Sequence, residues 1–325
     1  MTLLEVENLT TWFHTDRGTL KAVNEVTFQL ERGKTLGLVG ESGSGKSVLT
    51  RSIMGIQTGS HVARSSGRVL FNGTDLRSLP RKRLRAHWGR NIAIVPQNPL
   101  SSLNPVVKIG RQVTEILTRR LGMRQRSADA HALALLRSVG IPTPERRMRE
   151  YPHQLSGGMR QRVVIAMALA GEPGLLIADE PTTALDVTIQ AQILALLRRL
   201  QQEREMAMIF VSHDLAVVSS MADDIAVMYA GRLVEKADAD VVLTHPAMPY
   251  TEALIQSIPS LDHARHTLLP VIPGRPPDLV NVVPGCPFHP RCSRRGSGCD
   301  VDRPPIAGPP RHQYACWYPV ERDVV

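Results

Sequence analysis

The sequence predicts an α/β fold with a mainly parallel sheet. Short apolar runs alternate with longer segments of helical periodicity, and polar motifs follow directly after several of these runs. In open α/β sheets, ligands bind beyond the carboxyl ends of the strands, which is where these motifs fall. The runs with the length of buried strands are residues 36–39, 92–95, 175–178, 208–211 and 225–229.

The composition is that of a globular chain. The 325 residues are 42% hydrophobic, enough to bury a full core and to form two or three folded parts. The net charge of +9 suits an anionic partner such as nucleic acid or a membrane surface, although solvated helix faces explain most basic runs, such as residues 81–85. Aromatic residues make up only 4% and are not interleaved with basic ones, which argues against a stacking platform for nucleic acid.

The N-terminus and the apolar runs bear on export and membrane insertion. Glu5 and Glu7 stand where a secretory signal would carry positive charge, so we expect no export signal. The longest uninterrupted apolar stretch, residues 163–170, is far shorter than the ~20 residues needed to cross a bilayer. A role at a membrane would therefore require other subunits to form the passage.

The first polar motif is a phosphate-binding loop. Residues 40–47, GESGSGKS, match the pattern G-x-x-x-x-G-K-[ST], with a strand-like run at 35–39 before them and a helical pattern at 48–54 after them. Backbone N–H groups of such a loop surround phosphates, its lysine reaches the β and γ oxygens, and the next hydroxyl ligates Mg²⁺. An ordinary glycine turn before a helix is the alternative, which the flanking patterns disfavour. The predicted nucleotide-binding residues here are Gly40, Ser42, Gly43, Ser44, Gly45, Lys46 and Ser47.

Two carboxylates follow the apolar run at residues 175–178. Asp179 is suited to the Mg²⁺ shell, and Glu180 is suited to polarise the water that attacks a γ-phosphate. A strand that merely meets solvent would also end in acids, but the phosphate loop elsewhere in the chain favours the catalytic interpretation.

Residues 155–162, LSGGMRQR, suggest a second anion site. Ser156, Gly157 and Gly158 open the helical pattern of residues 163–170, and the N-terminus of a helix can face an anion. A glycine-rich helix cap is the simpler explanation from local chemistry alone.

The remaining chain contains an inserted helical part and a loop-rich end. Strand-like runs stop between residues 98 and about 158, where helical patterns at 109–121 and 128–139 predict a helical subdomain. Apolar residues at helical spacing predict a further helix over about 187–202, packed on the sheet. Residues 270–325 hold 12 of the 24 prolines and all four cysteines, which indicates a loop-rich extension that needs its own cross-link.

Six motifs occur together in order: the phosphate loop, Gln97 within residues 95–97, residues 155–161, the Asp179–Glu180 pair, residues 184–186, and His213 within residues 211–214. On these motifs, over about residues 1–235, the chain closely resembles the ATP-binding subunit of an ABC transporter; Met159, where glutamine is commoner, is a mild variation. The resemblance implies an α/β fold consisting of a P-loop NTPase (RecA-like) core with an antiparallel β subdomain, an inserted α-helical signature subdomain at about residues 98–165, and a loop-rich C-terminal cysteine-containing extension at residues 236–325.

The resemblance also implies roles for individual residues. In such cassettes two subunits pair head to tail, so Ser156, Gly157 and Gly158 would contact the γ-phosphate held by the partner's phosphate loop. Phe13 takes the position that stacks on adenine, with Trp12 as its rival. ATP and Mg²⁺ are the implied cofactors. The implied catalytic residues are Glu180, His213 and Gln97, and the implied Mg²⁺ ligands are Ser47, Gln97 and Asp179.

Cys286, Cys292, Cys299 and Cys316 lie close together in an otherwise cysteine-free chain. With no export signal expected, disulfides are disfavoured, which leaves four thiolates for a metal, although the C-x₂-C pairs of a zinc ribbon are absent. Residues 272–277 and 285–292 resemble the C-terminal extension of the dipeptide/oligopeptide importer subfamily, whose four-cysteine members can carry a [4Fe–4S] cluster. A zinc ion, or free or paired thiols, are the alternatives.

The resemblance implies an ATP-hydrolysing subunit of a membrane importer of dipeptides or oligopeptides, peripheral on the cytoplasmic face of the membrane. Its implied partners are a second ATPase subunit, commonly a paralogue, two transmembrane permease subunits and an extracytoplasmic substrate-binding protein, with no nucleic acid. The alternatives are the same machinery importing nickel complexes or sugars, a soluble ATPase acting on nucleic acid or in translation, and a scaffold that binds nucleotide without turnover. A single set of motifs argues against the soluble ATPase, and Glu180 and His213 argue against the scaffold.

Overall fold

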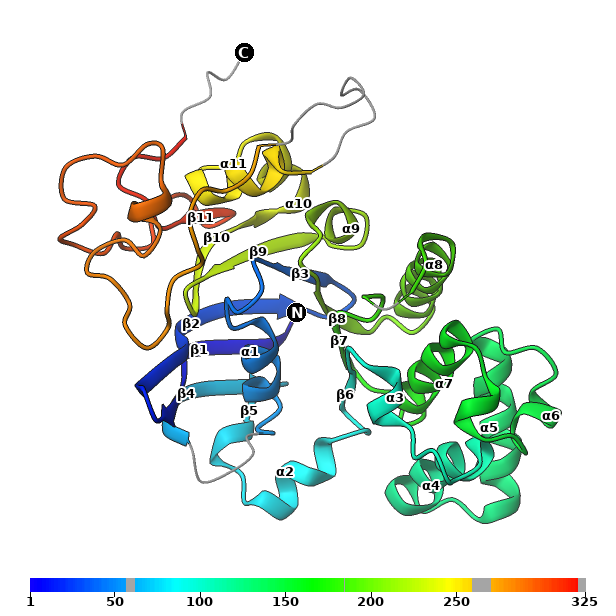
Figure 1. Ribbon diagram of the computed structural model, residues 1–325. Coiled ribbons are helices and arrows are strands. Elements are labelled where there is room, and N and C mark those ends of the chain that lie inside the picture. Colours follow the sequence, from blue (N-terminus) through cyan, green and yellow to red (C-terminus); the bar gives the residue numbers. More distant parts are fainter. Residues whose placement is uncertain (57–61, 184, 259–269, 321–325) are drawn as a thin grey trace. The chain divides into compact units, whose positions relative to one another are not determined.

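The computed structural model describes residues 1–56, 62–183, 185–258 and 270–320, and the chain divides into two compact units (Figure 1). Unit 1 consists of Met1, Glu31–Lys34 and Leu76–Ile209, and unit 2 consists of Thr2–Leu30, Thr35–Asp75 and Phe210–Val325. Across the described ranges, no helix has both the length and the apolar character needed to span a bilayer.

Unit 2 contains an antiparallel group of strands, which confirms the β subdomain implied by the resemblance. The strand order is β2 (Gly18–Glu31), β1 (Thr2–Thr15), β4 (Val62–Phe71) and β5 (Thr74–Asp75). In β1, the buried residues Leu4 and Val6 pair with Phe71 and Val69 of β4, so one face of these strands lies in the core.

A second group of strands in unit 2 carries the phosphate loop. β3 (Thr35–Val39) pairs in parallel with β9 (Asp224–Tyr229), and β10 (Arg232–Asp238) pairs antiparallel with both β9 and the short β11 (His312–Tyr314). All five residues of β3 are buried, as expected for a strand that is covered on both faces. The helices of unit 2 are α1 (Lys46–Ile53), α9 (Leu215–Ser219), α10 (Ala239–Thr244), α11 (Pro249–Gln256) and the 3₁₀ turn η3 (His289–Arg291).

Unit 1 contains the predicted helical subdomain and a parallel pair of strands. β6 (Ile92–Val95) and β7 (Leu175–Asp179) run in the same direction, and β8 (Ala207–Val211) begins in unit 1 and ends in unit 2. The helical elements are η1 (Leu76–Ser78), α2 (Arg81–His87), α3 (Pro99–Ser102), α4 (Ile109–Leu121), α5 (Gln125–Ser138), α6 (Pro144–Arg147), η2 (Pro152–Gln154), α7 (Gly157–Leu169) and α8 (Val187–Glu203). α4 and α8 match their predicted ranges closely, whereas α5 begins three residues before its predicted start because its first turn is polar.

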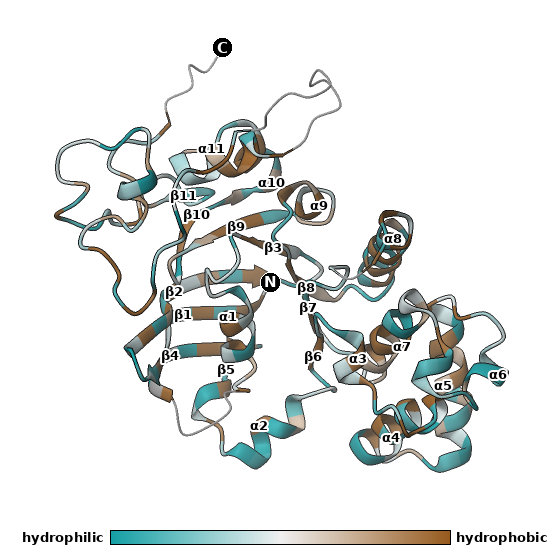
Figure 2. Cartoon of the chain, viewed as in Figure 1, coloured by the Kyte–Doolittle hydropathy of each residue, from teal (hydrophilic) through white to brown (hydrophobic). Residues whose placement is uncertain are grey.

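The hydropathy of the helices reflects their burial (Figure 2). α4 and α5 carry hydrophobic residues on the faces that pack together and hydrophilic residues elsewhere. α7 is buried along most of its length, whereas α2 has no buried residue and consists mostly of hydrophilic residues. The apolar stretch at residues 163–170 is therefore core rather than a surface feature.

The C-terminal extension is loop-rich, as predicted. Within residues 270–320, regular structure is limited to η3 and β11. Backbone hydrogen bonds tie the extension to unit 2, from the Lys21 N–H to the Leu279 carbonyl at 3.0 Å and from the Ala315 N–H to the Val234 carbonyl at 2.8 Å. The proposed boundary at residue 235 stays a prediction, because the extension packs in one unit with N-terminal segments of the cassette.

Candidate functional site

The phosphate loop in unit 2 requires glycine at three positions. Gly40, Gly43 and Gly45 have φ values of 148°, 81° and 105°, in the region that side chains disfavour. A Cβ at Gly40 would lie 2.2 Å from the Met228 carbonyl oxygen, and one at Gly45 would lie 2.1 Å from the Ala22 carbonyl oxygen. The sequence pattern therefore corresponds to a backbone path that only glycine can follow.

Polar groups of this loop are arranged to receive phosphates. Lys46 begins α1 and is buried, and its Nζ donates to the carbonyl oxygens of Gly40 at 2.7 Å and Glu41 at 3.1 Å. The Ser44 hydroxyl is buried and has no hydrogen-bond partner within the described part of the chain. A buried hydroxyl without a partner is unfavourable unless a ligand oxygen satisfies it, so this group fits a bound phosphate. Ser47 follows, half-buried.

His213 leaves the sheet at the same end as the phosphate loop. The Ser212 N–H donates to the Leu38 carbonyl at 3.2 Å, so β8 and β3 end side by side in unit 2. His213 is exposed, and the following residue, Asp214, caps α9 by accepting from the backbone N–H groups of Ala216 and Val217. This placement supports a phosphate-facing role for His213.

Trp12 and Phe13 lie next to each other on β1, both half-buried. The Lys21 ammonium and the Arg64 guanidinium lie 5.1 and 5.0 Å from the Trp12 ring centroid, within the range of cation–π contacts. Because cations already engage the Trp12 ring, the arrangement favours Phe13 as the residue that stacks on adenine, and this assignment stays a prediction.

Unit 1 brings the predicted catalytic residues Gln97 and Glu180 together. In the parallel register of β6 and β7, Val95 lies opposite Ala178, so the residues that follow both strands emerge at the same edge. Gln97 Nε2 donates to Glu180 Oε2 at 2.9 Å, and the Thr183 hydroxyl donates to the same oxygen at 3.0 Å.

The turn after β7 is strained. Asp179 ends β7 and is buried, whereas Glu180 adopts a left-handed backbone conformation with a φ of 48°. Such conformations cost about 1–3 kcal/mol in non-glycine residues and cluster at functional sites. The strain at Glu180 therefore supports a functional reason for this carboxylate.

The signature segment caps α7 and exposes its tip. The Ser156 hydroxyl accepts from the Met159 N–H at 3.3 Å, and Ser156 and Gly157 are exposed. Gly158 is buried, and a Cβ there would lie 2.7 Å from Ile189 Cγ2. Gly158 therefore allows α7 to pack on α8, whereas Ser156 and Gly157 are open to a partner or ligand.

Residues 184–186 are only partly described. Ala184 lies outside the described residues, and Asp186 caps α8 by accepting from the Ile189 N–H at 2.9 Å. Asp186 therefore has a structural role.

The four cysteines converge in unit 2 although 30 positions separate the first from the last. Repulsion from neighbouring cysteines helps to disfavour ionisation of Cys286, Cys292 and Cys316. Burial, which is the larger cause, raises the pKa of Cys286 and Cys292 and raises the pKa of Cys316 to about 11. Across the described ranges, however, no set of three or more His, Cys, Asp or Glu side chains is arranged at metal-ligating spacing.

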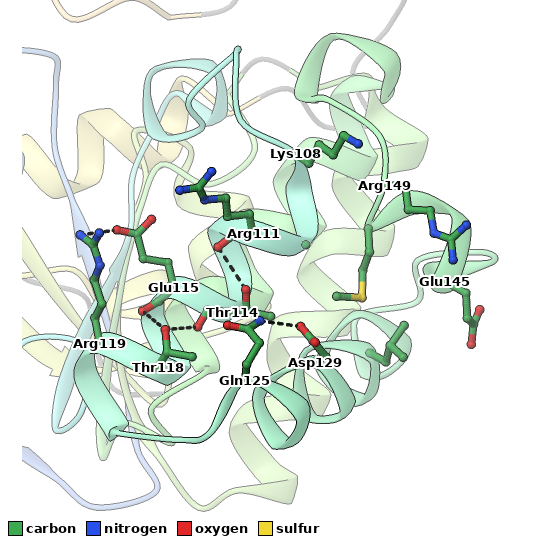
Figure 3. Close-up of a pocket in the computed structure, with 13 residues that line it drawn as sticks. Lys108, Arg111, Thr114, Glu115, Thr118, Arg119, Gln125, Asp129, Glu145 and Arg149 are labelled. Carbon is green, nitrogen blue, oxygen red and sulfur yellow. Dashed lines mark hydrogen bonds and ion pairs between the residues drawn. The ribbon is translucent and has the colours of Figure 1, made fainter.

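A separate polar cavity lies in the helical part of unit 1 (Figure 3). It measures about 720 Å³ and is lined mainly by α4 and α5. Its wall includes the Arg119–Glu115 ion pair at 2.7 Å and the Gln125–Asp129 hydrogen bond at 2.9 Å. None of the predicted nucleotide-site residues lines this cavity.

Sequence reasoning missed a group of residues that contact the phosphate loop. Glu41, at a variable position of the loop pattern, bonds the extension residue Arg291 and the α11 residue Tyr250. Tyr250 lies outside the motifs that the sequence suggested, and although Arg291 falls within residues 285–292, nothing in that segment marks it as a contact of the phosphate loop.

Comparisons with known proteins agree with this arrangement. The family model described as ABC transporter matches residues 23–183, and the model described as oligopeptide/dipeptide transporter, C-terminal region, matches residues 234–299. The chain is 46% identical to the dipeptide transport ATP-binding protein DppD of Bacillus subtilis, covering 98% of this chain and 96% of that protein. It is 44% identical to the oligopeptide transport ATP-binding protein OppD of Escherichia coli, covering 98% and 94%. Among solved structures, the dimeric bacterial ABC transporter cassette MJ0796 matches with a TM-score of 0.65 at 26% identity, covering 73% of this chain and 98% of that one.

Proposed function

Because the chain belongs to the ABC transporter ATP-binding family, we propose that it is the ATP-hydrolysing subunit of a membrane importer that energises uptake of dipeptides or oligopeptides. The match to the oligopeptide/dipeptide transporter C-terminal region is the observation that supports peptides as the cargo, because this region is the part of the chain that lies outside the ATP-binding cassette. Relatives that cover nearly the whole chain are described as dipeptide and oligopeptide transport proteins.

ATP is the substrate of this site. The glycine loop and Lys46 would bind its phosphates, with the unsatisfied Ser44 hydroxyl as a further donor. Glu180, held by Gln97 and Thr183, would polarise the water that attacks the γ-phosphorus as the bond to ADP breaks. His213 would contact the γ-phosphate.

The side chains suited to hold Mg²⁺ are oxygen donors, as that ion prefers. They are Ser47, Asp179 and Gln97, of which Asp179 is a buried carboxylate at a strand end. When bound, the ion neutralises charge on the phosphates.

The exposed tip of α7 supports a composite site made by two subunits. Ser156 and Gly157 present a hydroxyl and the first amides of a 13-residue helix. In the proposed dimer this tip would contact the γ-phosphate held by the partner's loop, so that ATP binding closes the dimer and hydrolysis reopens it.

The proposed assembly contains a second ATPase subunit, commonly a paralogue, two transmembrane permease subunits and an extracytoplasmic substrate-binding protein. In it this chain would be peripheral, on the cytoplasmic face of the membrane. The similarity to a dimeric cassette and to transport ATP-binding proteins supports this proposal.

Uptake in a strain from which the gene is deleted tests the cargo. Labelled di- and oligopeptides should no longer enter the deletion strain, and the wild-type gene should restore uptake whereas a Lys46→Ala gene should not. Normal peptide uptake in the deletion strain, with loss of nickel or sugar uptake instead, would reject peptides as the cargo.

We infer further that Cys286, Cys292, Cys299 and Cys316 hold a [4Fe–4S] cluster with a mainly structural role. Backbone N–H groups two residues downstream, from Phe288, Arg294 and Tyr318, hydrogen-bond to the sulfurs of Cys286, Cys292 and Cys316. Hydrogen bonds to sulfur are one of the ways in which proteins stabilise cluster thiolates. Thiolates at these positions would repel one another, so a cationic group fits among them, and it would cross-link a segment that has little regular structure.

Anaerobic purification of the full chain tests this inference. The protein should be brown, contain about four irons per chain as that cluster type requires, and lose its colour with any single Cys→Ser change. Colourless protein that contains one zinc ion per chain would reject the cluster in favour of a Cys₄ zinc site. Protein without metal would reject any metal site and show that the four cysteines are thiols.

A further inference from the structure

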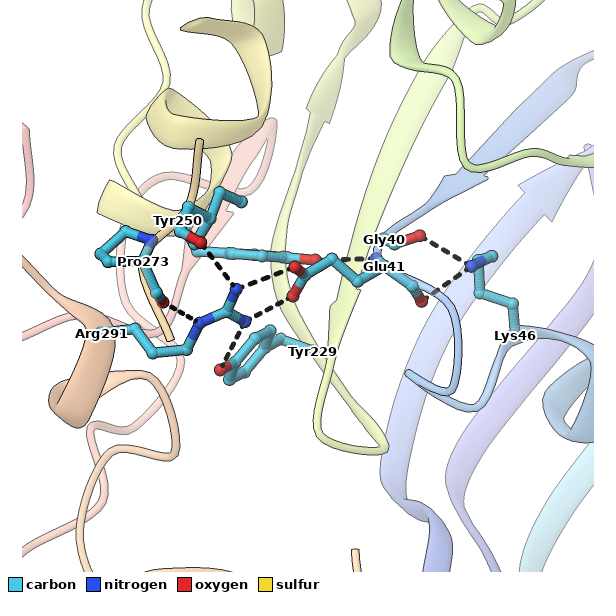
Figure 4. Close-up of polar contacts among 8 residues, drawn as sticks. Gly40, Glu41, Lys46, Tyr229, Tyr250, Pro273 and Arg291 are labelled. Atoms are coloured by element: carbon cyan, nitrogen blue, oxygen red, sulfur yellow. Dashed lines mark hydrogen bonds and ion pairs between the residues drawn. The ribbon is translucent and has the colours of Figure 1, made fainter. Parts of the chain in front are cut away.

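Arg291 connects the C-terminal extension to the phosphate loop within unit 2 (Figure 4). Its side chain is only 5% exposed, and its two terminal nitrogens donate to the two carboxylate oxygens of Glu41 at 2.6 and 2.9 Å. Its Nε donates to the Pro273 carbonyl at 2.7 Å. A buried, two-pronged pair of this kind fixes the orientation of both partners more strictly than a single ionic contact does.

Glu41 also contacts Lys46, the lysine of the phosphate loop. Its side chain binds Arg291, its backbone N–H donates to the Tyr250 hydroxyl at 2.8 Å, and its carbonyl accepts from Lys46 Nζ at 3.1 Å. The same carbonyl accepts from the Ser44 N–H at 3.1 Å. One residue of the loop is therefore held by the extension on one side and holds the lysine on the other.

Arg291 lies beside a cluster of three aromatic rings. The rings of Tyr229, Tyr250 and Phe288 pack against one another with centroids 4.5 to 5.4 Å apart. Burial raises the pKa of both tyrosines, so both hydroxyls stay protonated. The hydrogen bond to Glu41 raises the pKa of Arg291, which therefore stays charged.

The extension also contacts the loop directly. Pro276, Pro277 and Leu279 line a small pocket together with residues 41–44 of the loop. Arg291 ends η3, the turn between Cys286 and Cys292, in which the His289 N–H donates to the Cys286 carbonyl at 3.0 Å. The extension therefore contacts the loop both through this pocket and through Arg291, which stands next to Cys292.

The charge of Glu41 needs an explanation. A carboxylate in a loop that binds a polyanion opposes binding unless it is neutralised and turned away. The Arg291 guanidinium does both, and removing either partner would leave a poorly solvated charge next to the loop.

We propose that Arg291 is a positioning residue for ATP binding: through Glu41 it holds the phosphate loop and Lys46 in the conformation that receives the triphosphate. This inference rests on the proposed nucleotide site. It makes the C-terminal extension part of the nucleotide-binding apparatus of its own chain.

Hydrogen exchange and MgATP affinity of the full-length protein test the proposal. Arg291→Gln should speed amide exchange in residues 40–47 of the nucleotide-free protein and weaken MgATP binding about tenfold or more, within the usual range of coupling between sites. Arg291→Lys keeps the charge but not the planar fork, so it should recover only part of the affinity. If Arg291→Gln does not fold, Glu41→Gln removes the same ion pair by changing the loop residue, and the same two measurements apply.

Arg17→Gln is the matched control. Arg17 pairs with Asp278, so it also joins the extension to the cassette, but it lies on the exposed turn between β1 and β2. This variant should change neither loop exchange nor MgATP affinity.

Unchanged loop exchange and affinity in a folded Arg291→Gln protein would overturn the proposal. So would wild-type affinity in the Glu41→Gln/Arg291→Gln double variant, because Arg291 would then only neutralise a charge. Lys46→Ala tests the proposed nucleotide site independently of Arg291. Normal MgATP binding by Lys46→Ala would reject the nucleotide site. The exchange measurements in nucleotide-free protein would still test whether Arg291 holds the loop.

Discussion

At the residue scale, the structure supplies partners for Glu180. Gln97 and Thr183 both donate to one carboxylate oxygen, and the left-handed turn places this oxygen directly after β7. A carboxylate held by two hydrogen bonds is oriented before substrate arrives, which favours catalysis over a merely solvated strand end.

We expect Glu180→Gln to leave ATP binding intact, because the phosphate loop and Asp179 remain. Hydrolysis should slow by about 10²- to 10⁴-fold, the usual contribution of an acid–base group. ATP affinity and turnover in the fully assembled transporter measure the two effects. Thr183→Ala removes one of the two hydrogen bonds and should cause a smaller loss, whereas near-wild-type turnover of Glu180→Gln would refute its assignment.

The thiol of Cys316 makes the stability of the metal-free protein depend on pH. Burial, with repulsion from the other cysteines, raises its pKa from 9.0 to about 11 in the folded protein. A raised pKa favours the neutral thiol in the fold, so its stabilising contribution is complete below pH 9 and is lost as pH rises towards 11. The urea midpoint of metal-free protein should fall over this interval, and less steeply in Cys316→Ser. Parallel pH curves for the two proteins would contradict this expectation.

At the scale of the element, the contact between α7 and α8 distinguishes two neighbouring glycines. A Cβ at Gly158 would lie 2.7 Å from Ile189, whereas one at Gly157 would have its nearest neighbour, Leu185, at 3.6 Å. The same motif thus contains one glycine that packing requires and one that packing does not.

Gly158→Ala should therefore destabilise the protein by about 1–3 kcal/mol, the usual cost of overpacking a core. Gly157→Ala is the matched control and should be neutral or slightly stabilising, because alanine favours helices by about 1 kcal/mol over glycine. Urea unfolding measures both. The double variant Gly158→Ala/Ile189→Ala should recover part of the stability that Gly158→Ala loses. Equal stability of Gly157→Ala and Gly158→Ala would show that the packing of α7 on α8 does not require Gly158.

At the scale of the whole molecule, a composite site in a dimer predicts effects that cross between subunits. The α7 tip of one chain would complete the site whose lysine belongs to the other. The exposure of Ser156 and Gly157, next to a Gly158 buried within the same chain, is consistent with this division.

Ser156→Arg should abolish turnover at the site whose phosphate loop belongs to the partner, because the bulky side chain keeps the α7 tip from the γ-phosphate. Nucleotide binding by Lys46 of the altered chain should persist. Site-resolved ATP binding and hydrolysis in a transporter with one altered subunit provide the measurement. Full turnover by an isolated monomer would reject the composite site.

The local parts of this protein could be predicted from its residues. The phosphate loop, the buried strands β3, β6, β7, β8 and β9, and the helices α4 and α8 follow from residue type and periodicity, which act over a few neighbouring residues. The placement of Gln97 and Glu180 at strand ends also followed, because parallel strands bring their carboxyl ends to one edge.

Features that depend on residues far apart in the chain could be seen only in the folded protein. The antiparallel strands β1, β2 and β4 came from the family resemblance rather than from periodicity, because β1 pairs with β4, a strand far from it in the sequence. Spacing grouped the cysteines but could not show that their thiols converge. Arg291 and Glu41 are 250 residues apart and have no shared pattern, because a buried ion pair is specified by where the folded backbone carries its two charges and not by the neighbours of either one.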